Sequence, residues 1–159
     1  IYRNYSGVWD NAPVSEVTAG TNSFTDDISG FITEDGNFCY YVKALESGLT
    51  NVYGFADTSL SNIACTAQGP RLYTPNAFSP GGKNPVFYPI NAFIELNSYH
   101  FVVFNRWGEA IFESFDPKAG WDGTVDGQDA PVGVYVYLLS MDGANQRHIE
   151  RKGTISLIR

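Results

Sequence analysis

The sequence predicts an all-β fold, built from two Ig-like β-sandwich modules in tandem. The chain of 159 residues contains 16 glycines and 8 prolines, which suits many short strands joined by turns. Hydrophobic residues make up 43% of the chain and aromatic residues 15%, so packed cores can form. Short apolar runs alternate with polar positions at a period of two, and no helical periodicity competes with them.

The first module is expected to span residues 1–68 and to consist of short strands. The expected strands cover residues 1–4, 14–17, 23–25, 38–45, 53–58 and 61–65. Residues 38–45 show the clearest alternation, with Phe38 and Tyr40 on one face and Cys39 on the other.

The order of these strands resembles the second part of a fibronectin type III domain. The matching pieces are Ile1-Tyr2-Arg3, Ser23-Phe24-Thr25-Asp26, Tyr40-Tyr41-Val42-Lys43-Ala44 and Ser59-Leu60-Ser61-Asn62. The resemblance implies a module that is incomplete at its N-terminus, with its first two strands before Ile1. We therefore expect the chain to be the C-terminal part of a longer protein, with some core exposed unless another segment or a partner covers it.

The second module is expected to span residues 69–159. Its expected strands cover residues 72–79, 92–96, 99–105, 109–114, 133–141 and 148–158. Pro75 should break the first of these, as in an edge strand, and Gly108 should supply a positive φ in a hairpin turn. The boundary between the modules is expected at residues 66–70, a stretch so short that the modules should abut.

The charge of the chain limits its partners. The formal net charge is −7 at pH 7, of which residues 1–68 contribute −6 and residues 69–159 contribute −1. An acidic chain without a basic cluster argues against nucleic acid as a partner, and solubility is the simpler explanation of the acidic half. No apolar run is long enough to span a membrane as a helix, and no export signal is visible near Ile1.

The only two cysteines, Cys39 and Cys65, favour one disulfide in an exported protein. Two free thiols are the alternative, and zinc-site spacing is absent. In the fibronectin-like arrangement the two cysteines lie on or just after neighbouring antiparallel strands, so a bridge between them is plausible.

The second module also carries an ordered set of motifs. They are Thr74-Pro75-Asn76-Ala77-Phe78-Ser79-Pro80, Phe104-Asn105-Arg106-Trp107-Gly108, Trp121-Asp122-Gly123-Thr124, Ala130-Pro131-Val132-Gly133-Val134-Tyr135-Val136-Tyr137 and Gly153-Thr154-Ile155-Ser156-Leu157-Ile158-Arg159. In this order they resemble the gliding motility-associated C-terminal domain, the type B sorting domain of the type IX secretion system.

The resemblance implies a secretion and surface-targeting signal. It implies partners in the type IX translocon and an outer-membrane barrel protein of the PorP/SprF kind. The full protein would be a large adhesin of the gliding type, found at the cell surface, attached to the outer membrane or secreted. A carbohydrate-binding or cell-adhesion tandem is the alternative function.

No catalytic constellation is visible, so no enzyme, no cofactor and no metal ligand are expected. The sequence lacks a nucleophile elbow, a metalloprotease His-Glu pair and a phosphate loop. Asp122, Asp126 and Asp129 suggest calcium by proximity, but EF-hand spacing is absent and solvated loop acids are the simpler explanation. The loop after Phe78 departs from the resembled family, because it contains no aspartate.

The residues expected to bind a partner lie in two loops. Arg106 and Trp107 occupy one turn, and Gly81, Gly82, Lys83 and Asn84 occupy another. Arg with Trp is a typical recognition pair, and loops are free to bind because strands need their apolar faces for the core. The alternative is structural, with Trp107 packed over a sheet end and Arg106 stacked on its ring.

Overall fold

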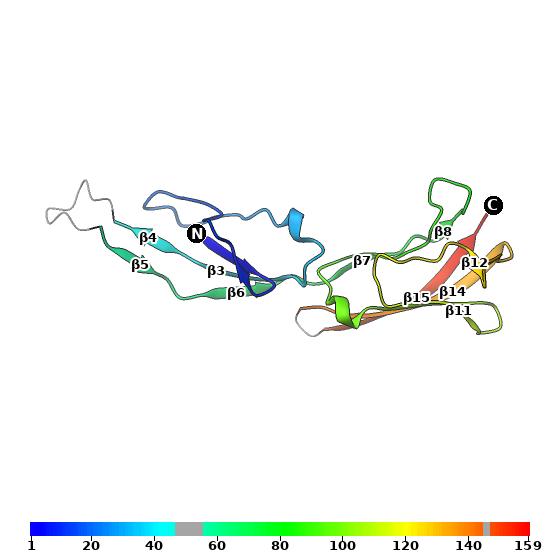
Figure 1. Cartoon of the computed structure of the whole chain (residues 1–159). Helices are drawn as coiled ribbons and strands as arrows, with labels where there is room; N and C mark the ends of the chain where they lie inside the picture. The colour runs from blue at the N-terminus through cyan, green and yellow to red at the C-terminus, as the bar shows by residue number, and fades with distance from the viewer. Residues whose placement is uncertain (47–55, 145–146) are drawn as a thin grey trace.

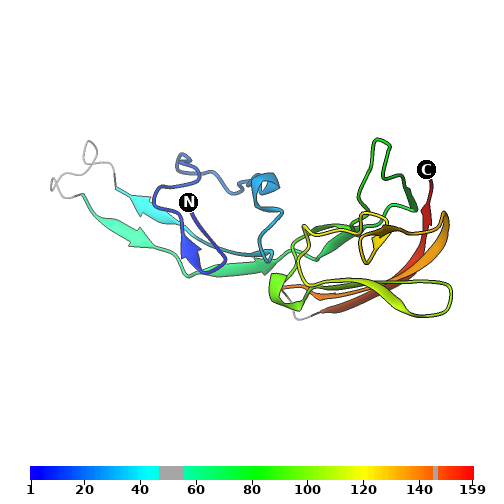
Figure 2. The same cartoon turned by 45° about the vertical axis from the view of Figure 1, so that its right-hand side comes forward.

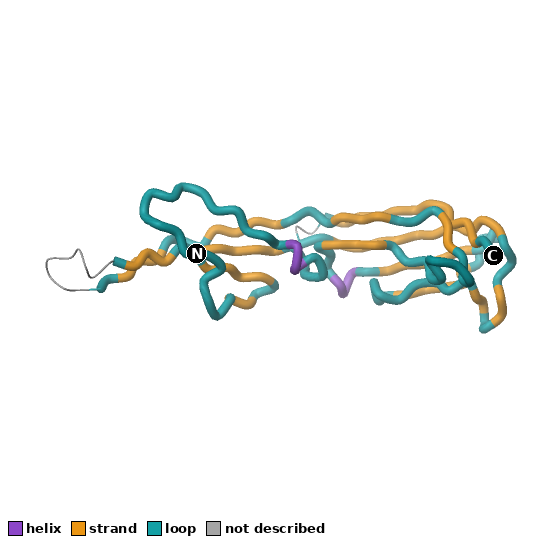
Figure 3. The backbone as a smooth tube through the Cα atoms, turned by 90° about the horizontal axis from the view of Figure 1, so that it is seen from above, coloured by secondary structure: helices purple, strands orange, loops and turns teal. Residues whose placement is uncertain are grey.

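The structure is a computed structural model that describes residues 1–46, 56–144 and 147–159. The predicted all-β class is confirmed, because strands dominate the described residues, whose helical elements are limited to two short 3-10 turns (Figure 1). The two halves of the chain lie end to end in an elongated molecule, as all three views show (Figures 1, 2 and 3). Within the described residues, no helix has the length and apolar character needed to cross a membrane.

The first half forms one four-stranded antiparallel sheet in the order β2-β1-β3-β6, with a two-stranded ladder of β4 and β5 beyond it. Its elements are β1 (Tyr2–Tyr5), β2 (Val8–Trp9), η1 (Ser29–Phe31), β3 (Asn37–Tyr41), β4 (Lys43–Leu45), β5 (Thr58–Leu60) and β6 (Ala64–Ala67). The strand predicted at residues 38–45 is divided at Val42, because Val42 exchanges hydrogen bonds with Ser61 in place of a regular ladder.

Four other strands predicted for this half differ from the observed ones or lie largely outside the described residues. The strands predicted at residues 14–17 and 23–25 are wrong, because both stretches belong to a long loop outside the sheet. The strand predicted at residues 53–58 lies largely outside the described residues. The strand predicted at residues 61–65 is shifted, because the chain pairs as β5 before it and as β6 from Ala64.

A partly buried ionic network holds the long loop against the sheet. The Arg3 guanidinium contacts Asp26 at 2.9 Å and Asp10 at 3.0 Å, and it lies 4.2 Å from the centre of the Phe31 ring. The Tyr40 hydroxyl donates to Asp26 at 2.9 Å. Burial alone would lower the pKa of Arg3, but hydrogen bonds and the charges of the two aspartates outweigh it and raise that pKa. The loop is therefore fixed by side chains and by a few backbone hydrogen bonds, such as that from Val14 to Ile1 at 2.9 Å, and not by regular strand pairing.

The same network predicts a loss of stability at alkaline pH. Burial and the hydrogen bond to Asp26 raise the pKa of Tyr40 from 10.0 to about 12. Because the folded state holds this proton more tightly than the unfolded state, its contribution to stability is complete below pH 10 and is lost as the pH rises toward 12. Chemical denaturation at several pH values should show a smaller alkaline loss in Tyr40→Phe than in the wild type. Equal losses in the two proteins would contradict this assignment.

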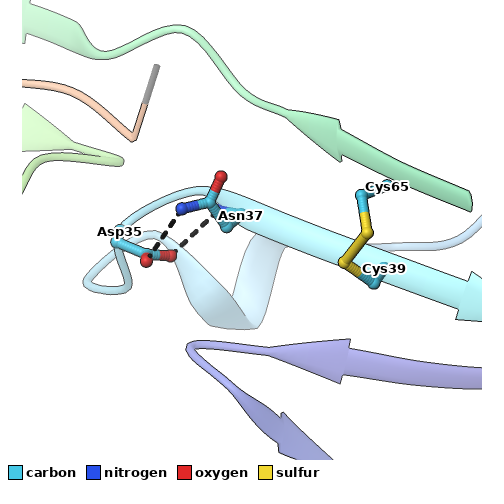
Figure 4. The surroundings of a disulfide bond; sticks show 4 residues. All are labelled: Asp35, Asn37, Cys39 and Cys65. Atoms are coloured by element: carbon cyan, nitrogen blue, oxygen red, sulfur yellow. Dashed lines mark hydrogen bonds between the residues drawn. A yellow bond between two sulfur atoms is a disulfide. The ribbon is translucent and has the colours of Figure 1, made fainter. Parts of the chain in front are cut away.

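The predicted disulfide between Cys39 and Cys65 is confirmed (Figure 4). The two residues lie directly opposite each other on β3 and β6, so Cys65 sits inside its strand and not after it. Both cysteines are paired, which excludes the alternative of two free thiols. Asp35 fixes the entry to β3, because its carboxylate accepts hydrogen bonds from the backbone and side-chain amides of Asn37 at 2.9 and 3.1 Å.

Removal of this bridge should destabilise the first half. The cysteines are 26 residues apart in sequence, and a loop of that size corresponds to roughly 3 kcal/mol of chain entropy. We expect Cys39→Ser/Cys65→Ser to lose about this much in urea denaturation. Intact mass after alkylation of unreduced, denatured wild type should show no alkylated thiol. Two alkylated thiols would show that the bridge does not form.

The second half forms a β-sandwich around a five-stranded sheet in the order β11-β10-β14-β15-β8. Its elements are β7 (Arg71–Tyr73), β8 (Ala77–Phe78), β9 (Ile90–Ala92), η2 (Leu96–Ser98), β10 (His100–Phe104), β11 (Ala110–Ser114), β12 (Thr124–Val125), β13 (Gln128–Asp129), β14 (Gly133–Asp142) and β15 (His148–Leu157). Pro75 breaks the first strand as predicted, so β7 pairs with β9 while β8 pairs with β15.

Two features of this half differ from the prediction. The strand predicted at residues 92–96 begins earlier, as β9, and stops at Phe93, whose φ of +57° is incompatible with a strand. The β12–β13 hairpin was not predicted, because each of its strands has two residues and no alternation can show in so short a segment.

The core of the second half lies on one face of the five-stranded sheet. Phe101 and Val103 of β10 and Leu139 of β14 are fully buried there, under Phe87 and Trp121 from the opposite layer. Within the opposite layer, Phe87 and Trp121 form an isolated antiparallel bridge, with reciprocal backbone hydrogen bonds of 2.8 Å.

The two halves meet around Phe93. Its backbone N–H donates to Ile32 at 3.0 Å, and its ring lies edge-on to Phe38, with 6.3 Å between ring centres. Gly36 lies beneath it with φ of +87°, and a Cβ atom there would approach the Cβ of Phe93 to 2.9 Å. Residues 68–70 connect the halves, and Gln68 donates to Gly36 at 2.8 Å. The halves therefore abut, as expected from the short connection.

Candidate functional site

The motif at residues 104–108 forms a hairpin turn that Asn105 organises. Its Oδ1 accepts hydrogen bonds from the backbone N–H groups of Trp107 and Glu109, each at 3.0 Å. Its Nδ2 donates to Oε2 of Glu109 at 2.9 Å. Gly108 has the positive φ that the sequence predicted, +83°. The turn is thus closed by one amide side chain, so its tip needs no contact with the core.

Arg106 and Trp107 form the exposed tip of this turn. The guanidinium carbon of Arg106 lies 4.2 Å from the centre of the Trp107 ring, within the range of a cation–π contact. Trp107 is 76% exposed. The predicted stacking of the pair is present, but the indole does not pack over the sheet end as the structural alternative required. A large aromatic ring held rigidly in solvent is available for recognition.

A cavity of about 320 Å³ lies beside this tip. The β10–β11 turn forms one wall, and the β12–β13 hairpin, through Gln128 and Asp129, forms the other. Its surface includes Val132 and Val134, each 60% exposed although apolar. The site therefore combines exposed apolar side chains with charged groups of both signs, Arg106, Glu109 and Asp129.

Arg159 and Tyr135 hold the second wall in place. Arg159 donates to the carbonyl of Ala130 at 2.7 Å and pairs with Asp129 at 3.1 Å. The Tyr135 hydroxyl donates to the carbonyl of Pro131 at 2.6 Å, and burial raises the pKa of this tyrosine. Sequence reasoning missed both roles, because a hydrogen bond to a distant carbonyl leaves no local pattern.

The other predicted loop is separate from this cavity. Gly81, Gly82, Lys83 and Asn84 do not line it. Their loop closes on its own base, since Asn84 donates to the carbonyl of Ala77 at 2.8 Å and Gly82 donates to that of Ser79 at 2.8 Å. It projects beside the C-terminus in both side views (Figures 1 and 2). The structure therefore groups Arg106 with Trp107 and leaves residues 81–84 as a second feature.

The remaining motifs build the core. Trp121 is fully buried and donates from Nε1 to the carbonyl of Thr124 at 2.8 Å. Asp122 accepts from the backbone N–H and the hydroxyl of Thr124, at 2.9 and 2.7 Å. Phe78 lies against Trp121, with 5.3 Å between ring centres. Phe78 and Trp121, which come from two different motifs, therefore belong to the same core.

Two of the three loop aspartates have structural partners. Asp122 caps the Thr124 turn and Asp129 pairs with Arg159. Across residues 1–46, 56–144 and 147–159, no three acidic, histidine or cysteine side chains gather as metal ligands would.

The second half is thus an Ig-like β-sandwich domain with an exposed turn at Arg106 and Trp107. The family of the CHU_C Type IX secretion signal domain matches residues 72–157, which is more than half of the chain. The chain belongs to this family, and its second half is a C-terminal type IX secretion signal domain. No curated protein matches the chain. Membership indicates an exported protein that interacts with the secretion system.

Proposed function

We propose that the secretion signal domain directs a large cell-surface protein, an adhesin of the gliding type, to the outer membrane by binding a barrel protein of the PorP/SprF kind. Residues 1–68 would be the last, fibronectin-like module of that protein's stalk, and residues 69–159 its sorting domain. In this proposal the chain acts by binding and catalyses no reaction. The observation that supports it is the exposed Arg106–Trp107 tip on a domain whose other motifs are occupied by the core.

Physical chemistry favours this tip as the docking point. Burial of an indole that is 76% exposed removes much apolar area from water. The Arg106 guanidinium adds a directional charge, and the neighbouring valines extend the apolar surface. Truncation of an anchor of this kind costs about 2 kcal/mol or more of binding.

Co-purification with the barrel protein tests the proposal. Trp107→Ala and Arg106→Ala should each weaken binding by about 2 kcal/mol or more, while the melting temperature of each stays close to that of wild type, because neither side chain supports the core. Lys83→Ala tests the separate loop at residues 81–84.

Tyr73→Ala is the matched control, because Tyr73 is an aromatic residue with 65% exposure on β7, outside the cavity. It should bind the barrel as the wild type does. If Trp107→Ala, Arg106→Ala and Lys83→Ala all keep both stability and binding, the docking surface is elsewhere. If Trp107→Ala unfolds the domain, its role is structural.

Carbohydrate binding is the second candidate function. The observation that favours it is the exposed Trp107 ring beside a cavity that also carries Gln128 and Asp129. A glycan array on residues 1–159 separates the two functions, since the sorting function predicts no sugar signal that depends on Trp107.

A further inference from the structure

The outer edge of β15 is unpaired along most of its length. β15 pairs with β14 at all ten positions from His148 to Leu157. On its other side it pairs with β8 only at Ser156 and Leu157. The chain before β8 leaves this sheet at Pro75, because β7 pairs with β9 in the opposite layer. Within the described chain, residues 148–154 therefore form an open sheet edge.

The backbone groups at this edge can be assigned from the pairing with β8. Ser156 donates its N–H to Asn76 at 2.9 Å, so its backbone faces outward. Backbone direction alternates along a strand, and the β14 ladder continues without a shift in register. Glu150, Lys152 and Thr154 therefore direct their N–H and C=O groups outward too. None of the described residues forms a hydrogen bond with these groups, and all three residues are exposed.

The charge at this edge differs from that of the whole chain. Residues 148–154 carry two basic residues, Arg151 and Lys152, and one acidic residue, Glu150, although the chain has a net charge of −7. Arg151 and Lys152 are exposed and form no ion pair with a described residue. Cations at an open edge repel basic strands and make pairing with neutral ones less favourable. They attract carboxylates.

We propose that the β15 edge binds an acidic, extended segment of a partner protein as an added β-strand. Outward N–H and C=O groups of Glu150, Lys152 and Thr154 would supply the main-chain hydrogen bonds, as in other cases of strand addition. Lys152 and Arg151 project from opposite faces of the strand, so carboxylates of the segment can pair on either face. The proposal does not depend on the Arg106–Trp107 tip.

A synthetic peptide with alternating glutamate and valine tests the proposal on residues 1–159 by NMR titration. The acidic peptide should bind and shift the amide resonances of Glu150, Lys152 and Thr154. The same peptide with lysine in place of glutamate should bind about tenfold more weakly or not at all. Absence of binding by the acidic peptide, or equal binding by both peptides, would overturn the proposal.

Two variants separate the contribution of the backbone hydrogen bonds to peptide binding from the contribution of the charge. Thr154→Pro removes an outward N–H but leaves the β14 ladder intact, a position where an edge strand tolerates proline. Thr154→Val is its control and keeps the N–H. Lys152→Glu reverses one charge and keeps every backbone group. We expect Thr154→Pro and Lys152→Glu each to weaken binding by about tenfold, and Thr154→Val to bind as wild type.

The results discriminate among the possible occupants. If Thr154→Pro fails to fold, Lys152→Glu still tests the proposal, because it leaves the backbone of the strand unchanged. Unchanged binding by Lys152→Glu would overturn the charge argument. Sedimentation of wild type should show a monomer. A dimer that Lys152→Glu dissociates would show that a second copy of the chain occupies the edge, which would also overturn the proposal.

Discussion

Trp121→Ala is expected to destabilise the secretion signal domain by about 3–5 kcal/mol. The Trp121 side chain is fully buried between Phe78 and Tyr135, with ring centres at 5.3 and 4.7 Å. Its removal opens a large cavity and also leaves the Thr124 carbonyl without its indole donor. Because whole domains are stable by only about 5–15 kcal/mol, the variant should be largely unfolded at a modest urea concentration. Tryptophan fluorescence and circular dichroism during urea denaturation measure the change.

Trp107→Ala is the matched control for that experiment. It removes the same side chain from a site with 76% exposure, and its effect on stability should be within about 0.5 kcal/mol. The comparison separates loss of core packing from loss of a tryptophan as such. Equal destabilisation by the two variants would contradict the assignment of Trp121 to the core and Trp107 to the surface.

Arg3→Ala is expected to destabilise the first half by about 3 kcal/mol or more. The side chain joins Asp10 and Asp26, and both carboxylates are largely shielded, with side-chain exposures of 23% and 15%. Without Arg3 they would lie close together without a compensating cation. Apart from this network, only a few backbone hydrogen bonds tie the loop to Ile1 and β1, so it should partly detach from β1. Hydrogen exchange of residues 10–28 should report this detachment, and urea denaturation should report the loss of stability.

Two further variants identify the cause. Arg3→Lys keeps the charge but cannot contact both carboxylates and the Phe31 ring with one planar group. We expect it to recover only part of the lost stability. Asp10→Asn/Asp26→Asn in the Arg3→Ala background should recover stability, because it removes the unpaired charges. Wild-type stability in Arg3→Ala alone would show that the network does not hold the loop.

The second half was the more predictable part of the chain. The strand β10 was predictable from the continuous apolar run of residues 101–104, and β14 and β15 from their length of ten residues each. Pro75 and Gly108 mark a break and a turn by their own backbone preferences. The first half was less predictable, because a long loop there is fixed by Arg3, Asp10 and Asp26. Contacts between residues up to 23 positions apart leave no local signature in the sequence.

In the candidate site, too, some features could be predicted from the local sequence and others could not. The turn that carries Arg106 and Trp107 was predictable from Gly108, but the exposure of Trp107 was not, because a turn sequence does not show whether an aromatic ring packs on the sheet end or faces solvent. The cavity beside it was not, because it depends on how the β12–β13 hairpin folds against β14. The contacts of Arg159 with Asp129 and Ala130 join segments about 30 residues apart, so they could be identified only in the folded chain.

Export of a fluorescent passenger tests the central claim most directly. The passenger is fused to residues 1–159 or to residues 1–68 and expressed with a periplasmic leader in a cell that has the type IX machinery. Family membership predicts that only the first fusion, which includes residues 72–157, reaches the cell surface or the medium. A third fusion with Trp121→Ala should remain in the periplasm. The account is contradicted if the 1–159 fusion stays periplasmic while an established type B domain exports the same passenger.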